Sequence, residues 1–443
     1  MGELNLWSQH RSYTSRYSRR RPEETALYQI IYNYEQELQN HWDELFQEKY
    51  GALRPCVVKA MDEYQSCGIL RFGCARAYCK CCMHSELIAF SCKKRGICAS
   101  CAAKRSILFA ENLHENVLLD QEHRHLVFTI PKRLRPYFMF DRSLLSILHK
   151  SAWLAWKQYL NSIIPDSTPA MVSAIHTAGS FLEFHPHIHA IALNGALDKD
   201  SNLIPLTSID TNKLEALFQK NIFEALHTKE LLSEDTIVNM ATWEHSGFSV
   251  FAGEAFNNKD QRLFLARYLK KPPVALSSLK LENNGLDTTV TITKQLDDGE
   301  HSVSFSPLEF LAKLQQHIPN TWEQSVRYFG AYSARTRGAK KIRKTQTEQD
   351  PNSIQPIIPL TSDDQSPDSD KTPTSSTWAR CIKKIYEVDP LTCPKCGEQM
   401  KIIAFIHNET EIQKIADHLG VITWTKPPPI TKTPTSITYD YSD

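Results

Sequence analysis

The chain has 443 residues, 41% hydrophobic and 23% charged, and 51 Lys and Arg against 50 Asp and Glu leave a formal net charge of +1. This composition is typical of a globular protein with roughly two to four domains and excludes a fully disordered chain. No apolar run approaches the roughly 18–20 residues of a membrane helix, and no apolar signal-peptide core follows Met1. We therefore expect a cytoplasmic protein with no membrane partner. Taken alone, a mean charge near zero argues against a nucleic-acid binder.

The first 60 residues divide into an arm and a helical segment. Residues 1–25 include the basic run from Arg16 to Arg21, and they predict a disordered arm that can contact phosphates. Residues 26–60 form the second part. Apolar residues recur there at helical spacing, at Leu27, Ile30, Ile31, Tyr34, Leu38, Trp42 and Leu45. This spacing predicts an amphipathic helix over residues 26–50.

Residues 61–105 are predicted to bind zinc, because nine of the 12 cysteines lie between Cys56 and Cys101. Two C-x-x-C pairs stand out, and their members are Cys79, Cys82, Cys98 and Cys101. Two such pairs at this separation are typical of one four-cysteine zinc ribbon. Cys67 and Cys92 can complete a second or shared site, or they can be small buried residues. The distant pair Cys393 and Cys396 stays open between a half ribbon, a redox pair and a simple turn.

Residues 106–344 alternate between strand and helix patterns and form the predicted catalytic domain. Helices are predicted over residues 107–119, 142–160, 211–232, 259–271 and 307–317. Strands are predicted over residues 125–130, 171–175, 181–192, 288–293 and 301–305. Asn194-Gly195 predicts a turn after the third of these strands, and Asp298-Gly299 predicts a hairpin between the last two.

Three histidines at period two make residues 183–189 the most informative stretch of the chain. On a strand, His185, His187 and His189 share one face with Glu183, and the opposite face is apolar. Three imidazoles side by side are a poor core and a good metal platform, although they do not fix the identity of the cation. Two chemistries use such a strand. Either the histidines hold a cation against a phosphate that a tyrosine attacks, or the central histidine itself attacks a nucleotide phosphate.

A tyrosine among cations ends the helix predicted over residues 259–271. Arg267, Lys270 and Lys271 surround Tyr268, and these cations favour the phenolate and bind phosphates. An ordinary core tyrosine is the alternative for the helix considered alone.

Charge is segregated along the chain although its mean is near zero. Residues 51–110 carry ten basic and three acidic residues, a local charge of +7, and residues 327–344 carry seven basic residues and no acid. The second stretch contains Arg335 and Arg337 among aromatic residues, a mixture that suits single-stranded nucleic acid. The remaining predicted parts are a flexible acidic linker over residues 345–376, a small C-terminal module over residues 377–425 and a tail over residues 426–443.

Several blocks in one order resemble the transposases of the insertion sequence 91 family, which are HUH endonucleases. The resemblance covers most of residues 60–410. It is carried by Cys67-Gly68, the two C-x-x-C pairs, Phe90-Ser91-Cys92-Lys93, Val127-Phe128-Thr129-Ile130-Pro131, Phe184-His185-Pro186-His187-Ile188-His189, Arg267-Tyr268, Arg327-Tyr328-Phe329-Gly330 and Val388-Asp389-Pro390-Leu391-Thr392-Cys393-Pro394. The family implies an α+β fold in which helices pack on an antiparallel sheet. This core would follow a zinc-ribbon-like module and precede a small C-terminal module.

The resemblance also implies roles for single residues. His187 and His189 would hold Mg²⁺ or Mn²⁺, with His185 or Glu183 as weaker candidates for a third ligand. Tyr268 would attack single-stranded DNA at an element end, giving a 5′-phosphotyrosine link and a free 3′-OH. Phe264 stands where some members have a second tyrosine, so this chain resembles the single-tyrosine branch. DNA contacts are expected from Arg267, Lys270, Lys271, Arg335 and Arg337, and structural Zn²⁺ from the cysteines.

The predicted function is rolling-circle transposition by an enzyme that acts on the DNA of a bacterial nucleoid. One alternative is a non-catalytic zinc DNA-binding protein or an inactive transposase relic, which would bind DNA without cutting it. The other is a histidine-triad nucleotide hydrolase or transferase. That alternative accounts for the histidine strand and leaves the cysteines, the tyrosine helix and the basic stretches without a role.

Overall fold

The computed structural model describes residues 21–283, 287–338 and 391–427. The predicted linker 345–376 and most of the arm and of the tail lie outside these ranges. Within them, the main helices are α1 (Ala26–Leu45), α2 (Gln47–Tyr50), α3 (Pro55–Gln65), α4 (Ala99–Asn116), α5 (Arg135–Phe140), α6 (Leu145–Asn161), α7 (Thr211–His227), α8 (Glu234–Ala241), α9 (Lys259–Tyr268), α10 (Pro307–Gln315) and α13 (Glu409–Leu419). None of the described helices combines the length and apolar character that crossing a membrane requires.

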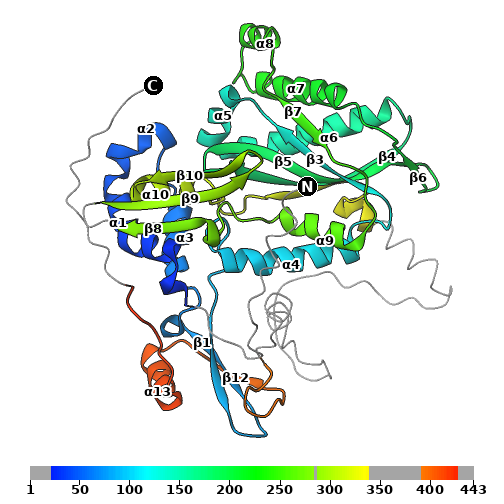
Figure 1. Ribbon diagram of the computed structural model, residues 1–443. Helices are drawn as coiled ribbons and strands as arrows, with labels where there is room; N and C mark the ends of the chain where they lie inside the picture. Colours follow the sequence, from blue (N-terminus) through cyan, green and yellow to red (C-terminus); the bar gives the residue numbers. More distant parts are fainter. Residues whose placement is uncertain (1–20, 284–286, 339–390, 428–443) are drawn as a thin grey trace, which may run out of the picture.

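An antiparallel sheet forms the centre of the molecule (Figure 1). Its strands run in the order β11-β4-β5-β3-β7, and β6 pairs with the far end of β5. Their bounds are β3 (His123–Thr129), β4 (Thr168–Ala178), β5 (Phe184–Leu197), β6 (Leu203–Pro205), β7 (Ser249–Ala252) and β11 (Val326–Gly330). This antiparallel sheet with packed helices confirms the expected α+β fold.

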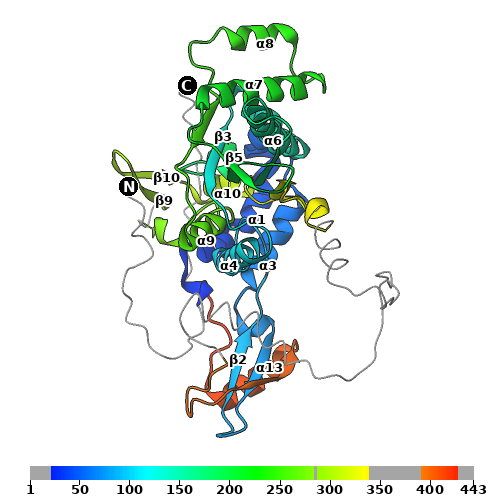
Figure 2. The same cartoon turned by 90° about the vertical axis from the view of Figure 1, so that its right-hand side faces the viewer.

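Strand alternation gives the central sheet two different faces. Ile188 and Ala190 of β5 belong to a large apolar cluster with α6 and α7. Ile191, between them and the end of the strand, belongs instead to a cluster formed with α4 and α9. His187 and His189 have the parity of Ile191, so they lie on the face that α4 and α9 cover. Figure 2 shows α9 and α4 together on one side of the strands and α6 and α7 on the other.

The N-terminal helices pack beside this core on a second antiparallel sheet. That sheet has the order β10-β9-β8, with β8 (Leu279–Asn283), β9 (Thr288–Leu296) and β10 (Gly299–Phe305). The apolar stripe predicted on α1 is buried there against α10 and β8, which confirms the helical prediction. The predicted hairpin at Asp298-Gly299 is also confirmed, because β9 and β10 pair from Leu296 opposite Gly299 onward.

A small third sheet joins a segment from the N-terminal part of the chain to the C-terminal segment. β1 (Cys74–Tyr78) pairs with β2 (Ser85–Ala89) on one side and with β12 (Lys401–Ile406) on the other. Helix α13 covers one face of this sheet through a small apolar cluster. We call residues 70–89 together with residues 391–424 the composite module. It projects from the body of the molecule at the bottom of Figures 1 and 2.

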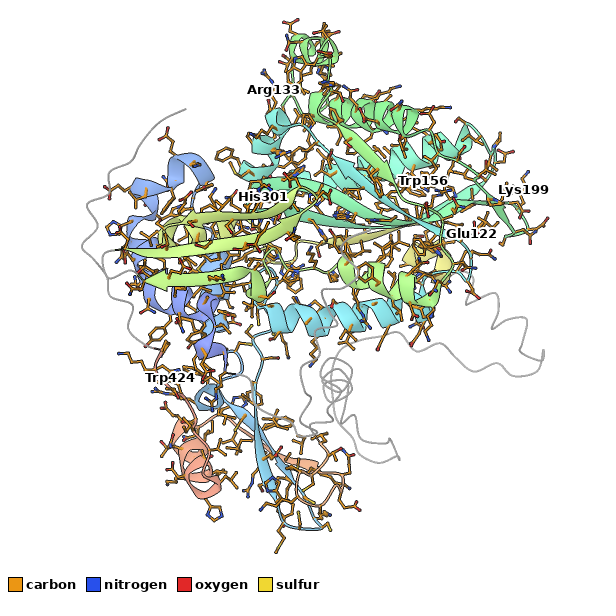
Figure 3. All side chains as sticks on the ribbon, viewed as in Figure 1. Glu122, Arg133, Trp156, Lys199, His301 and Trp424 are labelled. Carbon is orange, nitrogen blue, oxygen red and sulfur yellow. The ribbon has the colours of Figure 1, made fainter. Side chains whose placement is uncertain are left out.

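The turn predicted at Asn194-Gly195 is wrong, because β5 continues through it to Leu197. Gly195 is needed for close contact, since a Cβ atom there would lie 2.0 Å from the carbonyl oxygen of Ile204 on β6. The Asn194 side chain is buried and donates to Glu122 Oε2 at 3.0 Å, and Glu122 is labelled in Figure 3. Satisfied hydrogen bonds and a close strand neighbour thus outweigh the local turn preference.

A buried histidine between α6 and β4 should make folding sensitive to acid. His149 Nδ1 shares a hydrogen bond of 2.6 Å with Ser173 Oγ, and burial, with a smaller contribution from Arg327, lowers the pKa of His149 to about 3. In the unfolded chain a histidine protonates near pH 6.5, so stability is lost as pH falls from 6.5 toward 3. Between pH 7 and pH 5, the effect of this residue should lower the free energy of unfolding by about 2 kcal/mol.

Urea unfolding at pH 7 and pH 5 checks this expectation. The loss of unfolding free energy between the two pH values should be about 2 kcal/mol smaller in His149→Asn than in the parent chain. His245→Asn is the control, because His245 is exposed and should leave the loss unchanged. An equal loss in His149→Asn and the parent would contradict the assignment of the effect to His149.

Candidate active site and cysteine groups

Three histidines from two neighbouring strands form a compact group on the α9 side of the central sheet. His187 and His189 come from β5, and His176 comes from β4, where it lies directly opposite His187 in the strand register. One ring nitrogen from each of the three lies within 4.8 Å of the others. Three converging imidazole nitrogens at this separation can bind one divalent cation.

Hydrogen bonds orient each of the three rings. His187 Nδ1–H donates to the carbonyl oxygen of His185 at 2.6 Å, and His176 Nε2–H donates to that of Leu269 at 3.4 Å. His189 Nδ1 shares a hydrogen bond of 3.0 Å with His125 Nε2 on β3. Each ring therefore keeps its other nitrogen for a metal, which is the usual arrangement around protein metal ligands.

Burial keeps these imidazoles neutral at physiological pH. It is the largest cause that lowers the pKa of His176, to about 3, and it also lowers the pKa of His187 and His189. The pKa of His125 falls to about 4 for the same reason. Neutral imidazole is the form that binds metals, so the group needs no further deprotonation to do so.

The two weaker candidates for a third ligand lie outside this group. The His185 ring centroid is 5.1 Å from that of His187, yet no nitrogen of His185 belongs to the converging set. Glu183 turns back on its own loop, where its carboxylate accepts from Ser180 N–H at 3.0 Å and from Phe181 N–H at 2.8 Å. The register between β4 and β5 shifts beyond His176. The third member of the converging group is His176.

The tyrosine helix is anchored between α4 and the sheet. Asn258 caps α9, and Leu265, Ala266 and Leu269 pack in the cluster that α4 and the strands form. The predicted end of this helix at the proline pair is confirmed to within a turn, since α9 ends at Tyr268. Buried apolar residues on both sides of the tyrosine thus fix its direction.

Tyr268 lies against the histidine group. Its ring centroid is 4.9 Å from that of His189 and 5.6 Å from that of His176. Lys271 Nζ stands 5.0 Å from the centroid of the tyrosine ring, where its charge favours the phenolate. Phe264, one turn earlier on α9, is half exposed and carries no nucleophile. The site therefore presents one phenol beside one candidate metal position.

The five cations expected to contact DNA fall into two sets. Arg267, Lys271 and Arg335 are exposed and free to meet a charged ligand. Lys270 is turned inward, where its Nζ donates to Ser325 Oγ at 3.2 Å, and burial lowers its pKa to about 8. Arg337 is held by internal contacts, because its Nε–H donates to the carbonyl oxygen of Tyr332 at 3.1 Å. Lys270 and Arg337 are thus engaged in contacts within the chain.

Eight of the described cysteines converge in two groups of four, and this division differs from the predicted grouping. Cys98 and Cys101 at the start of α4 converge with Cys67 and Cys92, and three of the S···S distances are 3.6–3.8 Å. Cys79 and Cys82, expected in the same site, converge elsewhere with two C-terminal cysteines, Cys393 and Cys396. Sequence spacing could not reveal this division, because the second pair of each group depends on tertiary contacts.

Loss of the first cysteine group should destabilise the body of the protein. Cys98 is buried in the same apolar cluster as the N-terminal helices, so a metal held there connects α4 to α3. Cys98→Ser should lower the zinc content by one ion per chain and the unfolding free energy by on the order of 3 kcal/mol. Metal analysis and urea unfolding measure both effects, with Cys56→Ser as the control outside the two groups. Unchanged zinc content in Cys98→Ser would refute the assignment.

Two functional candidates, His176 and His125, were missed from the sequence. The strand expected at residues 171–175 stops one residue short of His176, although Val172, Ala174 and His176 continue one alternation. His125 opens the strand expected at residues 125–130 and has the right parity. The signal was present in both cases, but only the register between strands places these residues beside His189.

Comparison with known proteins gives two matching families and two relatives. A family described as "Transposase zinc-binding domain" matches residues 37–130, and one described as "Putative transposase" matches residues 170–340. The "Transposase for insertion sequence element IS801" of Pseudomonas savastanoi pv. phaseolicola is 26% identical over 394 residues, 83% of this chain and 88% of that protein. The "Putative transposase y4qJ" of Sinorhizobium fredii (strain NBRC 101917 / NGR234) is 20% identical over 323 residues, 68% of this chain and 80% of that protein. No solved structure matches.

Proposed function

The chain belongs to the insertion sequence 91 family of transposases, and from that membership we propose that it cuts and rejoins single-stranded DNA through a 5′-phosphotyrosine intermediate. Transposase activity makes DNA its partner and cleavage of DNA its general chemistry. The proposal concerns the single-stranded form of the DNA substrate, the attacking tyrosine and the bound cation. The observation that carries the proposal is the contact of the Tyr268 ring with two of the three converging histidines.

The proposed cation site consists of His176, His187 and His189. A divalent cation bound there would polarise the scissile phosphate and offset the negative charge that develops during the reaction. Imidazole nitrogens hold a borderline ion such as Mn²⁺ better than Mg²⁺, which prefers oxygen ligands. We therefore expect Mn²⁺ to support activity at lower concentrations than Mg²⁺ does.

The proposed reaction begins with attack by the Tyr268 hydroxyl oxygen on a DNA phosphorus atom. The new bond joins the phenol oxygen to phosphorus, the bond from phosphorus to the 3′ oxygen breaks, and the phenol proton is lost while the 3′ oxygen gains one. The phosphodiester is exchanged for a phosphotyrosine ester of similar energy. A 3′-OH can then attack that ester and restore a DNA strand, so no nucleotide cofactor is needed.

The surroundings of Tyr268 support a DNA strand as substrate. Lys271 lies over the tyrosine ring, and Arg267, which precedes the tyrosine, is exposed, as is Arg335. Exposed cations bind phosphates without reading base sequence. We propose that recognition of element ends comes in part from the cysteine-rich portion of the chain, and that the protein acts on bacterial nucleoid DNA.

Labelled oligonucleotides test the proposed function. Single strands that tile the DNA on both sides of the gene are incubated with the full-length protein and Mn²⁺ or Mg²⁺, and products are separated on a denaturing gel. A strand with a 3′ label should become covalently attached to the protein. The same strand with a 5′ label should give only a shorter free product. The duplex form of each oligonucleotide is the control for strand preference.

Each departure from this result has a defined meaning. Attachment of the 5′ label would overturn the proposed polarity of the phosphotyrosine link. Cleavage without any adduct would overturn the tyrosine as nucleophile. Binding without cleavage for every strand and both cations would favour a DNA-binding protein or an inactive relic.

A further inference from the structure

The second cysteine group is assembled from two segments that lie far apart in the sequence. Cys79 and Cys82 lie between β1 and β2, and Cys393 and Cys396 precede β12. Cys82 and Cys393 are separated by 311 positions, yet their Sγ atoms are 3.4 Å apart. The Sγ atoms of Cys79 and Cys396 are 3.5 Å apart. The family match for zinc binding ends at residue 130, so it contains only half of this group.

The two C-x-x-C turns have the same construction. In the first turn, Cys79 N–H donates to the carbonyl oxygen five residues later, at His84, over 2.8 Å. Cys393 N–H in the second turn donates to the carbonyl oxygen of Glu398, also five residues later, over 2.8 Å. The residue that follows the second cysteine has a positive φ in both turns, 57° at Met83 and 78° at Gly397. Two turns of one design that face each other are the pattern of a zinc ribbon.

The sulfur positions fit one tetrahedral ion. A Zn–S bond of about 2.3 Å places tetrahedral ligands about 3.8 Å from one another. All four Sγ atoms lie within 4.8 Å of one another. Cys81 lies inside the first turn but is exposed and belongs to neither group, so it offers a matched control.

Besides the pairing of β1 with β12, the described residues of the two segments of the composite module are held together mainly by small apolar clusters. One of these clusters consists mainly of the cysteines and their neighbours on the sheet. At the end of the module, Trp424 packs near Tyr32 of α1 in the body of the protein, with ring centroids 6.3 Å apart, and Figure 3 shows Trp424 at the junction with the N-terminal helices. Protein units this small usually need a metal or disulfides for stability.

We propose that Cys79, Cys82, Cys393 and Cys396 bind a second structural zinc ion that clasps the C-terminal segment to the N-terminal cysteine hairpin. The module is then one zinc ribbon built from two distant parts of the chain. The ion closes a loop of more than three hundred residues that includes the entire central sheet. This inference is independent of the proposed reaction at Tyr268.

Metal analysis of the full-length protein tests the site. The parent chain and Cys81→Ser should each contain two zinc ions, and Cys393→Ser/Cys396→Ser should contain one. X-ray absorption of the parent alone should show every zinc ion with four sulfur ligands at about 2.3 Å, a result that does not depend on whether the variant folds. One zinc ion in the parent, two in the double variant, or iron or disulfides in place of zinc would overturn the second site.

A cleaved chain tests the clasp itself. A protease site is inserted between residues 345 and 376, the protein is tagged at its N-terminus, and the C-terminal fragment recovered with the tag after cleavage is measured. The fragment should remain bound in the parent and in Cys81→Ser. Cys393→Ser/Cys396→Ser should retain at least about tenfold less, a loss of about 1.4 kcal/mol or more in binding free energy. Equal retention in the double variant would show that the ion does not hold the segments together.

Discussion

Replacement of Tyr268 by phenylalanine should abolish the covalent adduct between the protein and single-stranded DNA. The substitution removes one oxygen atom and keeps the ring that packs against His189 and His176. The fold should therefore persist while the attacking atom is lost. Removal of a nucleophile costs on the order of 10⁴–10⁶-fold in rate, so the adduct should fall below detection. The measurement is a single-turnover time course with a 3′-labelled strand on a denaturing gel.

Tyr137→Phe is a suitable control for this experiment. Tyr137 lies on α5 and packs against the α6 and α7 side of the sheet, away from the histidine group. Its loss of a hydroxyl group should leave the adduct unchanged. An adduct that persists in Tyr268→Phe would assign the nucleophile to another residue and would remove the main support for the proposed mechanism.

The second large effect is expected at His176, which only the three-dimensional structure places in the site. His176→Ala should slow adduct formation by about 10²–10³-fold, as should His187→Ala, because each removes one of three cation ligands. His185→Ala should cost less than about tenfold, since His185 shares the face but not the converging nitrogens. Single-turnover rates measured over a range of Mn²⁺ concentrations give the comparison.

The dependence on Mn²⁺ separates a lost ligand from a damaged fold. A variant that lacks one ligand should need more Mn²⁺ and should recover part of its rate when the ion is raised. A misfolded variant should not recover at any concentration. If His185→Ala were as slow as His187→Ala and His176→Ala were normal, the ligand set would be His185, His187 and His189, as the sequence pattern alone suggests.

Local patterns predicted the parts of the fold that local forces determine. The apolar stripe of α1 and the alternation of β9 and β10 needed no long-range information, and the structure confirms both. The face shared by His187 and His189 followed from strand parity in the same way. Local patterns did not predict which distant residues lie beside one another. His176 reaches His187 only through the register of β4 against β5, and nothing in either strand alone specifies that register.

Long-range contacts also explain why the structure differs from the predicted turn at Asn194-Gly195 and from the predicted grouping of the cysteines. A glycine after asparagine favours a turn, but here the glycine admits the backbone of β6 at close range. Two nearby C-x-x-C pairs favour one shared zinc ion, but Cys79 and Cys82 meet Cys393 and Cys396 instead. In each case the residue types were identified correctly, and the segment that approached them came from elsewhere in the chain.

The position of β12 beside β1 has a consequence for synthesis on the ribosome. β1 and β2 emerge early, but the strand that covers the other edge of β1 emerges more than three hundred residues later. At about 5–20 residues per second, that edge stays open for roughly 15–60 s in every nascent chain. An open strand edge is a template for pairing with another chain. Newly made molecules on one messenger RNA are therefore exposed to mispairing at β1 until each chain is nearly complete.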